Sequence, residues 1–459
     1  MANSRDLQLN NVSSRVENVL HEQIQKDDHL VLGLSGGLDS VVLLSILVPL
    51  SFKLKFKLTA FHVNHGISPN SNKWEKFCFD LCSRNNIPIE AAKLKIKKLS
   101  GTSLEANARD ARYQEFKNIK ADYVVLAQHL DDQAETLLLQ MLRGAGAKGL
   151  GAMPVVRNQV LKIGEQDFGL GPQILRPLLE VSRDEIEDYA QNYKLSWIID
   201  ESNNNLSFDR NYLRHKIFPL LEIKFPSYRN IFLRTSRHMA ETSYLLDDLA
   251  KLDSEDCLVL DQIQIKKLRK LSFPRAKNLL RYDLCQRGAS LPSAAKLEDM
   301  LRQLLSSRLD TKLHITFGDT EVRCFKGSVY VGKISTPPNK ERKFIWKGEK
   351  KLEITDKGDA VRFIREKGKG INLQKLKKEP IFIRSRLGGE RMRPDCNRPR
   401  RSLKNLLQEA SLPWWERESL PLLFSGENLV WVPGVGVDCA FQAGASDSGL
   451  IVSWHPNSD

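Results

Sequence analysis

The sequence predicts an α/β protein. Its N-terminal part is expected to be a doubly wound parallel sheet, followed by a mostly helical middle domain and a small α+β C-terminal domain. From Leu30 to about Arg143, short apolar runs alternate with longer amphipathic runs, the pattern of strands joined by crossover helices. Leucine-rich helical periodicity dominates from Asn230 to about Leu305. A chain of 459 residues also exceeds what one hydrophobic core usually supports.

The alternating segment contains four expected strands, each followed by an expected helix. The strands are the short apolar runs at residues 30–34, 58–63, 87–94 and 123–127. The helices are the amphipathic runs at residues 38–48, 73–84, 104–119 and 133–142. Because parallel sheets bind ligands at the carboxyl ends of their strands, we expect the chemistry directly after Leu34, Val63 and Ala127.

The rest of the chain predicts two further domains. Residues 172–200 are expected to form a strand, a helix and a strand, and residues 212–221 a helix that closes near Pro219. Further strands are expected at residues 313–317, 321–324 and 329–331, and a proline-containing linker at residues 336–340. We therefore expect a catalytic domain over residues 1–225, a mainly helical domain over 226–335 and an α+β domain over 340–459.

The composition is that of a globular protein with a basic surface. It is 41% hydrophobic and 27% charged, and the formal net charge is +14. This charge favours nucleic acid as a partner over a basic surface without a ligand, because the excess gathers late in the chain. Residues 1–10 do not resemble a secretory signal, and the longest apolar run, residues 41–52, is too short to cross a bilayer. We expect a cytoplasmic protein without membrane association.

The seven cysteines are expected to be reduced thiols, because their number is odd and they are scattered along the chain. Cys78 and Cys82 are four residues apart, so they share one face of a helix and are expected in the core. No second pair completes four ligands, and the sequence therefore predicts no zinc site.

A turn rich in glycine and serine stands between the first expected strand and its helix. It reads Ser35-Gly36-Gly37-Leu38-Asp39-Ser40. Glycines let a backbone approach phosphate oxygens, and the free N–H groups at the start of the next helix hold negative charge. The hydroxyls add donors, and Asp39 can hold a Mg²⁺ ion that bridges phosphates. The alternative is a tight turn with a serine cap, but six residues of these types in this context favour phosphate binding.

This turn resembles the SGGxDS motif of the PP-loop ATP pyrophosphatases. The resemblance implies attack on the α-phosphorus of ATP, transfer of AMP to the attacking oxygen, and displacement of AMP by a nucleophile. The sequence contains no G-x-x-x-x-G-K-[ST] string, so it does not indicate a Walker-type NTPase. Residues 144–149 spell GxGxxG, but they follow a helical run and are only a weak dinucleotide signal.

Polar residues also follow the second strand and occupy the third helix. His62, Asn64 and His65 end the second strand, where adenosine would lie, although a lone histidine is more often structural. Arg109 and Arg112 share one helix face with an acidic neighbour. This pattern fits an intrahelical salt-bridge ladder and a grip on phosphate or the target nucleotide equally well.

Two later strings carry candidate ligand contacts. Asp132 and Glu135 are three residues apart, so both carboxylates lie on one helix face and could seat an ammonium group; they also fit a capping pair at the helix start. From the residues alone, Arg210, Asn211 and Arg214 fit a capped helix that begins after a loop.

Together and in this order, these strings resemble the tRNA(Ile)-lysidine synthetases, and the similarity covers most of the chain. It extends into the C-terminal part through Gly388-Gly389-Glu390 and Ser402-Leu403-Lys404, and it departs from the family at Gln128, where histidine is common. The resemblance implies ligation of L-lysine to C2 of the cytidine at the first anticodon position of the AUA-decoding tRNA(Ile), which has a CAU anticodon. It implies an adenylated tRNA intermediate and the use of ATP and Mg²⁺.

The resemblance also implies roles for individual residues. ATP would be held by residues 35–40 with His62, Asn64 and His65, and Mg²⁺ by Asp39. Lysine would be held by Asp132 and Glu135. Catalysis would depend on Asp39, Arg109, Arg112, Asp132 and Glu135. The expected tRNA contacts are Arg210, Asn211, Arg214, Arg391, Arg393 and Lys404.

The middle and C-terminal domains are expected to bind tRNA, and no DNA partner is expected. Arginines crowd residues 384–401, where solvated charge is the usual alternative to nucleic-acid binding. Trp414 and Trp415 lie nearby and could belong to the core of a small domain. A homodimer is left open.

Two other functions are left open by the residues. A tRNA thiolase or another PP-loop enzyme would usually need a cysteine pair, a sulfur-carrier site or a glutaminase domain, and the sequence shows no CxxC string and no candidate glutaminase cysteine before the loop. A non-catalytic RNA-binding protein that senses ATP would bind nucleotide without forming AMP.

Overall fold

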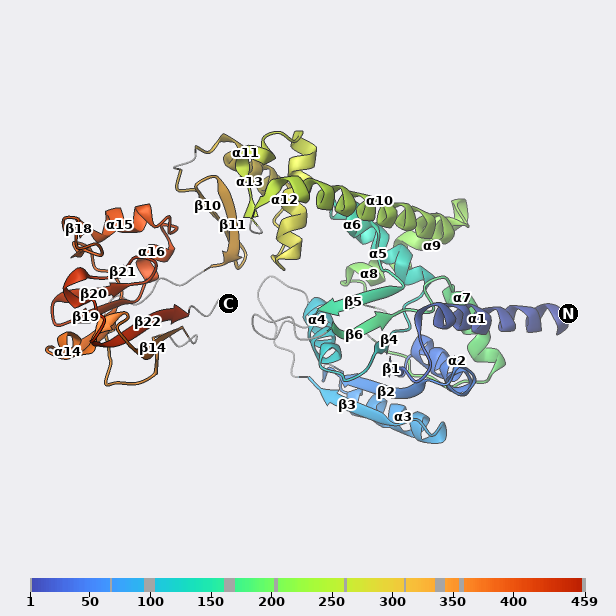
Figure 1. Ribbon diagram of the computed structural model, residues 1–459. Coiled ribbons are helices and arrows are strands. Elements are labelled where there is room, and N and C mark those ends of the chain that lie inside the picture. Colours follow the sequence, from blue (N-terminus) through green and yellow to red (C-terminus); the bar gives the residue numbers. More distant parts are fainter. Residues whose placement is uncertain are drawn as a thin grey trace. The chain divides into compact units, whose positions relative to one another are not determined.

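The computed structural model describes residues 2–66, 68–94, 104–160, 170–201, 205–259, 262–308, 311–334, 343–354 and 359–455 (Figure 1). The chain divides into two compact units, Met1–Leu246 and Asp247–Asp459. The first unit contains a mostly parallel sheet, and the second passes from helices into antiparallel sheets. The predicted fold class is thus confirmed: a parallel-sheet α/β part, a helical middle region and an α+β C-terminal part.

Six strands form the sheet of the first unit, in the order β3-β2-β1-β4-β6-β5. They are β1 (His29–Gly33), β2 (Lys57–Asn64), β3 (Ile89–Lys93), β4 (Tyr123–Val125), β5 (Val156–Val160) and β6 (Leu170–Leu175). β1 pairs in parallel with β2 on one side and β4 on the other, and β5 joins β6 antiparallel at the edge. Strand order therefore reverses between β1 and β4, where open parallel sheets bind their ligands.

The helices of the α/β part include all of the predicted amphipathic runs, together with two helices, at residues 2–23 and 147–150, that were not predicted. They are α1 (Ala2–Gln23), α2 (Leu38–Leu54), α3 (Ser71–Arg84), α4 (Leu104–Lys117), α5 (Leu130–Leu142), α6 (Ala147–Leu150) and α7 (Arg183–Asn192). α1, α2 and α7 pack against one another, α3 contacts β2 and β3, and α4 contacts β6.

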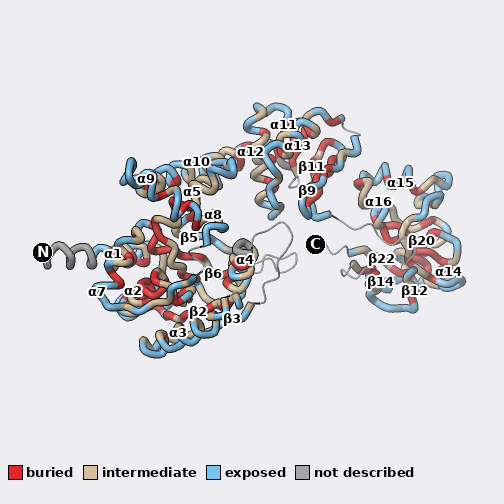
Figure 2. Tube along the Cα trace, turned by 180° about the vertical axis from the view of Figure 1, so that it is seen from behind, coloured by how far each residue is buried: buried red, intermediate tan, exposed pale blue. Residues whose placement is uncertain are grey.

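The core of this part lies between the sheet and its helices, as the buried stretches in Figure 2 show. Leu30 and Leu32 of β1 and Leu47 of α2 are fully buried, and each such side chain stabilises the fold by about 2 kcal/mol. Cys78 and Cys82 are fully buried in the same core, as predicted.

A helical segment closes the first unit against α5. It comprises α8 (Asp209–Tyr212), the π-helical turn η2 (Leu213–Ile217), α9 (Phe218–Lys224) and the first part of α10 (Tyr228–Cys257). Leu213, Phe218 and Tyr228 pack with Ala134 of α5. The prediction that a helix closes near Pro219 was wrong, because Pro219 lies in the first turn of α9, where a proline costs no intrahelical hydrogen bond.

The strand predicted at the end of residues 172–200 was also wrong. Residues 195–200 form neither helix nor strand after α7, and the strand at this edge of the sheet is instead β5, from residues before β6. Ile198 donates its backbone N–H to the carbonyl of Gly36 at 2.9 Å. The segment therefore supports the glycine turn instead of extending the sheet.

The second unit begins with the end of α10 and a small helical layer on an antiparallel sheet. Its elements are β7 (Leu258–Val259), β8 (Gln262–Ile263), α11 (Ile265–Leu268), α12 (Phe273–Gln286), α13 (Ala294–Ser306), β9 (His314–Phe317), β10 (Thr320–Phe325) and β11 (Ser328–Lys333). Leu279, Leu301 and Val322 are among its fully buried residues. The three strands predicted at residues 313–331 are confirmed; the linker predicted at residues 336–340 lies outside the described residues.

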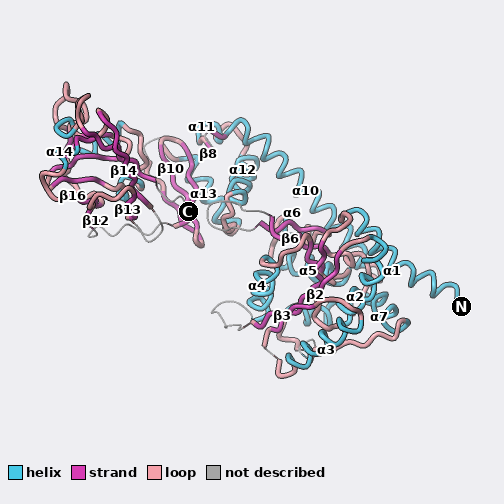
Figure 3. The backbone as a smooth tube through the Cα atoms, turned by 60° about the horizontal axis from the view of Figure 1, so that its bottom comes forward, coloured by secondary structure: helices cyan, strands magenta, loops and turns pink. Residues whose placement is uncertain are grey.

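The C-terminal part of the second unit consists mainly of antiparallel strands, drawn in magenta in Figure 3. A five-stranded sheet has the order β12-β16-β19-β20-β21, a four-stranded sheet has the order β13-β14-β22-β15, and β17 pairs with β18. The strands are β12 (Lys343–Ile345), β13 (Lys351–Glu353), β14 (Ala360–Lys367), β15 (Ile371–Asn372), β16 (Ile381–Arg384), β17 (Arg391–Met392), β18 (Arg401–Ser402), β19 (Leu422–Ser425), β20 (Asn428–Val432), β21 (Gly436–Val437) and β22 (Ser448–His455). The helices are α14 (Leu373–Leu376), α15 (Leu403–Glu409), α16 (Glu416–Ser419) and the 3₁₀ turn η3 (Cys439–Phe441).

The prediction that every cysteine is a reduced thiol was wrong. Cys396 and Cys439 form a disulfide, although reduced thiols were expected throughout, because the fold brings their Cα atoms to 5.4 Å across 43 residues of sequence. Within the described part of the chain, no helix is both long and apolar enough to cross a membrane.

Candidate active site

The turn at residues 35–40 joins β1 to α2 and is held by its own serines. Ser35 Oγ lies 3.1 Å from Ser40 Oγ, and Ser40 donates to the carbonyl of Gly37 at 2.9 Å. The amides in the first turn of a helix have no intrahelical acceptors, and the helix dipole makes this end positive. The start of α2, with Leu38 as its first residue, can therefore receive phosphate oxygens.

Gly36 is required by both conformation and space. Its φ is +85°, and a Cβ placed there would lie 2.7 Å from Cδ1 of Ile198 and 3.1 Å from Sγ of Cys78. Any side chain at this position would strain the backbone and push against the core. The turn is thus fixed from below by α3 and by the segment that follows α7.

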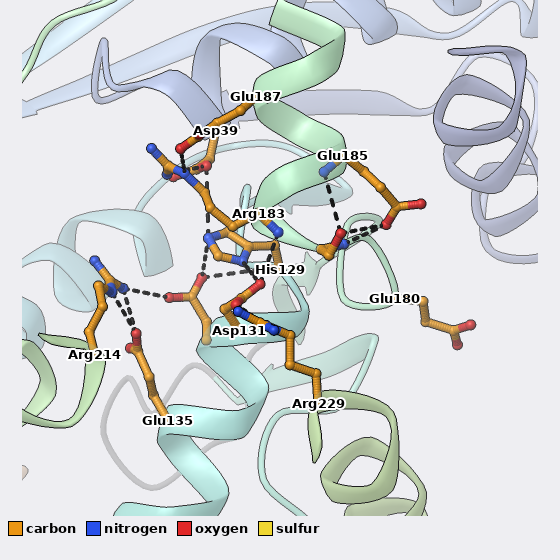
Figure 4. Close-up of polar contacts among 12 residues, drawn as sticks. Asp39, His129, Asp131, Glu135, Glu180, Arg183, Glu185, Glu187, Arg214 and Arg229 are labelled. Carbon is orange, nitrogen blue, oxygen red and sulfur yellow. Dashed lines mark hydrogen bonds and ion pairs between the residues drawn. The ribbon is translucent and has the colours of Figure 1, made fainter. Parts of the chain in front are cut away.

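Asp39, in the first turn of α2, is tied to two other elements (Figure 4). Its Oδ1 accepts a 2.7 Å hydrogen bond from Nη1 of Arg183 at the start of α7. The same oxygen lies 3.8 Å from Nε2 of His129, which directly precedes α5. The His129 ring is buried, and it also lies 3.5 Å from Oδ2 of Asp131 and 3.6 Å from Oδ2 of Asp132.

The charge of His129 follows from these neighbours. Burial alone would lower the pKa of its imidazole, but Asp132, Asp131 and Asp39 together raise that pKa to about 9. The ring is therefore an imidazolium at neutral pH. It is a buried cation that links the carboxylate of the glycine turn to the acidic start of α5.

Asp131 anchors this network to the helical segment. Its Oδ1 accepts a 2.5 Å hydrogen bond from Nε of Arg229, and its Oδ2 accepts one of 2.9 Å from the backbone N–H of Arg183. Burial would raise the pKa of Asp131, but His129 and Arg229 hold it well below its usual range. Asp131 is therefore a permanently charged structural carboxylate.

Asp132 and Glu135 form a pair that holds a cation. Glu135 is almost fully buried and accepts a 2.7 Å hydrogen bond from Nε of Arg214, on η2. Nη2 of Arg214 also lies 3.7 Å from Oδ1 of Asp132. Burial, reinforced by Asp132, raises the pKa of Glu135. The two carboxylates thus lie together as predicted, with a guanidinium where the sequence suggested an ammonium group.

Two of the residues after β2 support the edge of the sheet. His62 is buried, and its Nδ1 lies 2.8 Å from the carbonyl oxygen of Leu34. Asn64 donates to Oε2 of Glu75 at 2.7 Å and accepts from the backbone N–H of Gly66 at 3.0 Å. Both side chains therefore shape the predicted adenosine edge through contacts within the protein.

His65 and the arginines of α4 lie at the same edge. Burial and the charge of Arg112 lower the pKa of His65 to about 4, so its imidazole is neutral at pH 7. The Nδ1 atom of His65 is buried and has no hydrogen-bond partner among the described residues. The guanidinium carbon of Arg109 lies 5.6 Å from the ring centroid of Tyr113. The structure thus brings Arg112 close to His65, while Arg109 turns toward Tyr113.

The residues predicted to contact tRNA divide into two groups. Arg210 donates to Oγ1 of Thr136 on α5 at 3.2 Å, and Asn211 donates to the carbonyl of Asn205 at 3.0 Å. With Arg214 on Glu135, these side chains are held against the protein.

In the second unit, Arg391, Arg393 and Lys404 are exposed, and none of the described carboxylates lies within ion-pair distance of them. Other arginines of the same run are paired, as Arg401 is with Glu409. Each of the three predicted contacts therefore carries a charge that no described acidic side chain neutralises.

Trp414 and Trp415 are half-buried and do not form the core of the C-terminal part. Their rings pack edge to face with centroids 5.4 Å apart, and the guanidinium carbon of Arg323 lies 5.4 and 5.2 Å from them. They belong to a contact with β10, so neither is a free stacking platform.

Three residues of the network were missed by sequence reasoning. His129 lies inside the string that supplied Asp132 and Glu135, but nothing in the pattern marks it as a buried cation. Arg183 follows the Ser182 cap of α7, which reads as an ordinary helix start. Arg229 belongs to α10, and only the tertiary fold brings it to Asp131.

Comparison with known proteins identifies relatives of the whole chain. Family models match at residues 8–221 (PP-loop domain), 263–330 (TilS substrate binding domain) and 381–454 (TilS substrate C-terminal domain). The tRNA(Ile)-lysidine synthase of Nitrosomonas europaea is 46% identical over 457 residues, covering 100% of this chain and 98% of the relative. Enzymes of the same name from Coxiella burnetii and Azoarcus sp. are 33% and 36% identical, each covering 94% of this chain and 94% and 92% of the relatives.

Proposed function

The chain belongs to the tRNA(Ile)-lysidine synthase family, and from that premise we propose that it joins L-lysine to C2 of the cytidine at the first anticodon position of tRNA(Ile). In general terms, it is a PP-loop ligase that uses ATP to modify tRNA. The proposed tRNA carries a CAU anticodon and decodes AUA after modification. The products are lysidine, AMP and pyrophosphate.

The first step activates the cytidine. The C2 oxygen attacks the α-phosphorus of ATP, an O–P bond forms, and the bond to pyrophosphate breaks. In this proposal, the start of α2 and the hydroxyls of Ser35 and Ser40 hold the phosphates, while Arg112 and neutral His65 lie at the adenosine edge. Neutrality suits His65 to hydrogen bonding rather than to charge pairing.

Asp39 fits a role in holding Mg²⁺. Its Oδ1 is engaged by Arg183, but no hydrogen bond involves its Oδ2 among the described residues, and the side chain is 28% exposed. Magnesium is usually bound by one or two carboxylates together with water and substrate phosphates. When bound, it would neutralise charge on the phosphates as pyrophosphate departs.

The second step transfers lysine. The ε-amine of lysine attacks C2, the C2–O bond to AMP breaks, and the nitrogen loses its proton. Asp132 and Glu135 already hold the guanidinium of Arg214, which supports their assignment to an amino group of lysine. Binding of lysine would then displace or share this guanidinium.

One observation carries the proposal. His129 lies between Asp39 on the ATP side and Asp131 and Asp132 at the acidic start of α5, with separations of 3.5–3.8 Å. A single buried cation thus joins the phosphate site to the carboxylate pair, at the point where strand order reverses. Adenylation and lysine transfer can then act on the same C2 atom without moving the RNA.

The test is the fate of labelled ATP and of the tRNA. Incubation with the CAU tRNA(Ile) and lysine is expected to yield AMP, together with a tRNA fragment heavier by one lysine residue. A thiolase would instead require a sulfur donor, and an ATP-sensing RNA-binding protein would form no AMP. ADP and orthophosphate as products, or a tRNA of unchanged mass, would refute the proposal.

A further inference from the structure

Three arginines converge on the ring of Tyr113 in the first unit. The guanidinium carbons of Arg109 and Arg157 lie 5.6 and 5.9 Å from its ring centroid, and Nη2 of Arg176 lies 3.5 Å from its hydroxyl oxygen. The ring itself is fixed by an edge-to-face contact with Phe116. The arginines come from α4, from β5 and from the residue directly after β6.

Arg176 is the unusual member of this cluster, because it is only 2% exposed and its hydrogen-bond partners are neutral. Nη1 donates to the carbonyl of Pro154 at 2.9 Å, and Nε donates to the side-chain oxygen of Gln128. A buried arginine is usually paired with a carboxylate. In the part of the chain that the structure describes, no carboxylate forms an ion pair with Arg109, Arg157 or Arg176.

The surroundings of Tyr113 are correspondingly positive. Burial would raise the pKa of its hydroxyl, yet Arg176 and Arg109 lower it below its ordinary value. Like charges gathered this closely repel one another, and an anion bound among them removes that cost. Guanidinium groups present planar N–H donors that match the oxygens of a phosphate.

The cluster lies at the same edge of the sheet as the PP-loop. Gln128 follows β4, Arg176 follows β6, and Arg157 on β5 pairs with Ile174 near the end of β6. β6 is separated from β1 by β4, which places the cluster roughly 10 Å along the sheet from the PP-loop. The acidic start of α5 follows β4, between the two sites.

We propose that Arg109 and Arg157, supported by Tyr113 and the buried Arg176, form a second phosphate subsite that takes a backbone phosphate of the tRNA. This inference rests on the proposed function in taking tRNA as the polyanion and in placing the phosphates of ATP at the PP-loop. ATP is the other source of phosphate, but the PP-loop already receives its phosphates, and the acidic start of α5 separates the two sites. Arg109 and Arg157 make the contacts, whereas Arg176 is a positioning residue.

Arg157→Gln is the decisive variant, because Arg157 is exposed and its loss leaves the core intact. Affinities of the full chain for unmodified tRNA and for ATP are measured separately, the former across a series of KCl concentrations. We expect tRNA to bind about five- to ten-fold more weakly, with a salt dependence shallower by about one phosphate contact, and ATP affinity to stay unchanged. Arg157→Lys keeps the charge and is expected to restore most of the salt dependence.

The matched control is Arg84→Gln. Arg84 is an exposed arginine at the end of α3, where the chain turns back toward the amino end of β3. It is expected to leave both affinities unchanged. Unchanged tRNA affinity and salt dependence in Arg157→Gln would overturn the proposal. A loss of ATP affinity alone would assign the phosphate to ATP and also overturn it. These binding measurements need no lysine, so a failure of the lysine-transfer proposal leaves them interpretable.

Discussion

The carboxylate of Asp39 and the guanidinium of Arg183 form a 2.7 Å hydrogen bond that joins the PP-loop to helix α7 across 144 residues of sequence. Arg183 also donates its backbone N–H to Asp131 at 2.9 Å and its Nε to Glu187 at 2.8 Å. The orientation of the carboxylate beside the phosphate site therefore depends on a residue that touches neither glycine of the turn. We therefore expect the function of this loop to be sensitive to substitutions outside it.

Replacing Asp39 itself is expected to abolish catalysis. Asp39→Ala removes the carboxylate that we assign to Mg²⁺, and Asp39→Asn removes its charge while keeping its shape. Both variants should lose tRNA-dependent formation of AMP, as measured by thin-layer analysis of labelled ATP. Circular dichroism should match that of the unmodified protein, because the side chain is partly exposed. Retained activity in either variant would contradict the assigned role.

Arg183→Gln is expected to act through Asp39. Without the guanidinium the carboxylate loses its fixed orientation, and the Mg²⁺ concentration that gives half-maximal AMP formation should rise about ten-fold. Glu187→Gln is the matched control, because it removes the other side-chain partner of Arg183 and leaves the bond to Asp39 in place. An equal response of the two variants to Mg²⁺ would show that the bond to Asp39 has no such effect.

The sequence carried most of the information needed for the parallel sheet and its binding turn. Expected strands and helices up to residue 142 agree with the structure to within a few residues at most ends, because apolar periodicity depends on local spacing alone. The glycine turn could also be predicted from local sequence, since two glycines between a strand and a helix allow few other backbone conformations. Gly36, with its positive φ and its close neighbours, shows why.

Contacts between residues that are distant in the sequence could not be predicted from local patterns. No local pattern shows that residues 195–200 support Gly36 instead of forming a strand, because Ile198 reaches Gly36 only in the folded chain, through a backbone hydrogen bond and a side-chain contact. The raised pKa of His129 arises from carboxylates on two separate elements. The pairing of Cys396 with Cys439 likewise depends on how the turn after β17 approaches η3 in the folded chain.

Asp131→Asn is expected to destabilise the protein, and to do so more at neutral than at acidic pH. Because the folded-state pKa of Asp131 lies below its unfolded value near 3.9, its contribution is present above that pH and is lost as pH falls through the folded-state pKa. At pH 7 the substitution should lower the free energy of unfolding by about 3 kcal/mol, since Arg229 and His129 lose a buried partner.

Urea unfolding would test this, at pH 7 and at the lowest pH at which the unmodified protein stays folded. The difference in free energy of unfolding between the unmodified protein and Asp131→Asn should be smaller at the lower pH. Asp188→Asn, at an exposed carboxylate without an ion pair among the described residues, should have no effect at either pH. A difference that does not change with pH would argue against the ionic role of Asp131.

The exposed arginines of the C-terminal part are expected to contact the tRNA backbone. The double variant Arg391→Gln, Arg393→Gln should bind tRNA about ten-fold more weakly, with a salt dependence shallower by about two phosphate contacts. Arg401→Gln serves as the control, because Arg401 is already neutralised by Glu409 and should matter less. Filter binding over a range of KCl concentrations measures both quantities. An equal loss of tRNA affinity in the double variant and in Arg401→Gln would show that an arginine need not be free of ion pairs to bind the tRNA.

Asp132→Asn is expected to weaken the binding of lysine selectively. Asp132 accepts the backbone N–H of His129 at 3.1 Å, and asparagine can keep that capping contact, so the start of α5 should stay folded. The lost charge removes an ionic partner of the amino group that we place beside Glu135, and the KM for lysine should rise at least ten-fold. The KM for ATP and the affinity for tRNA should change little, because the substitution leaves the residues of the PP-loop and the arginines assigned to tRNA in place. AMP formation titrated with lysine at saturating ATP and tRNA measures the effect, and an unchanged KM for lysine would place the amino-acid site elsewhere.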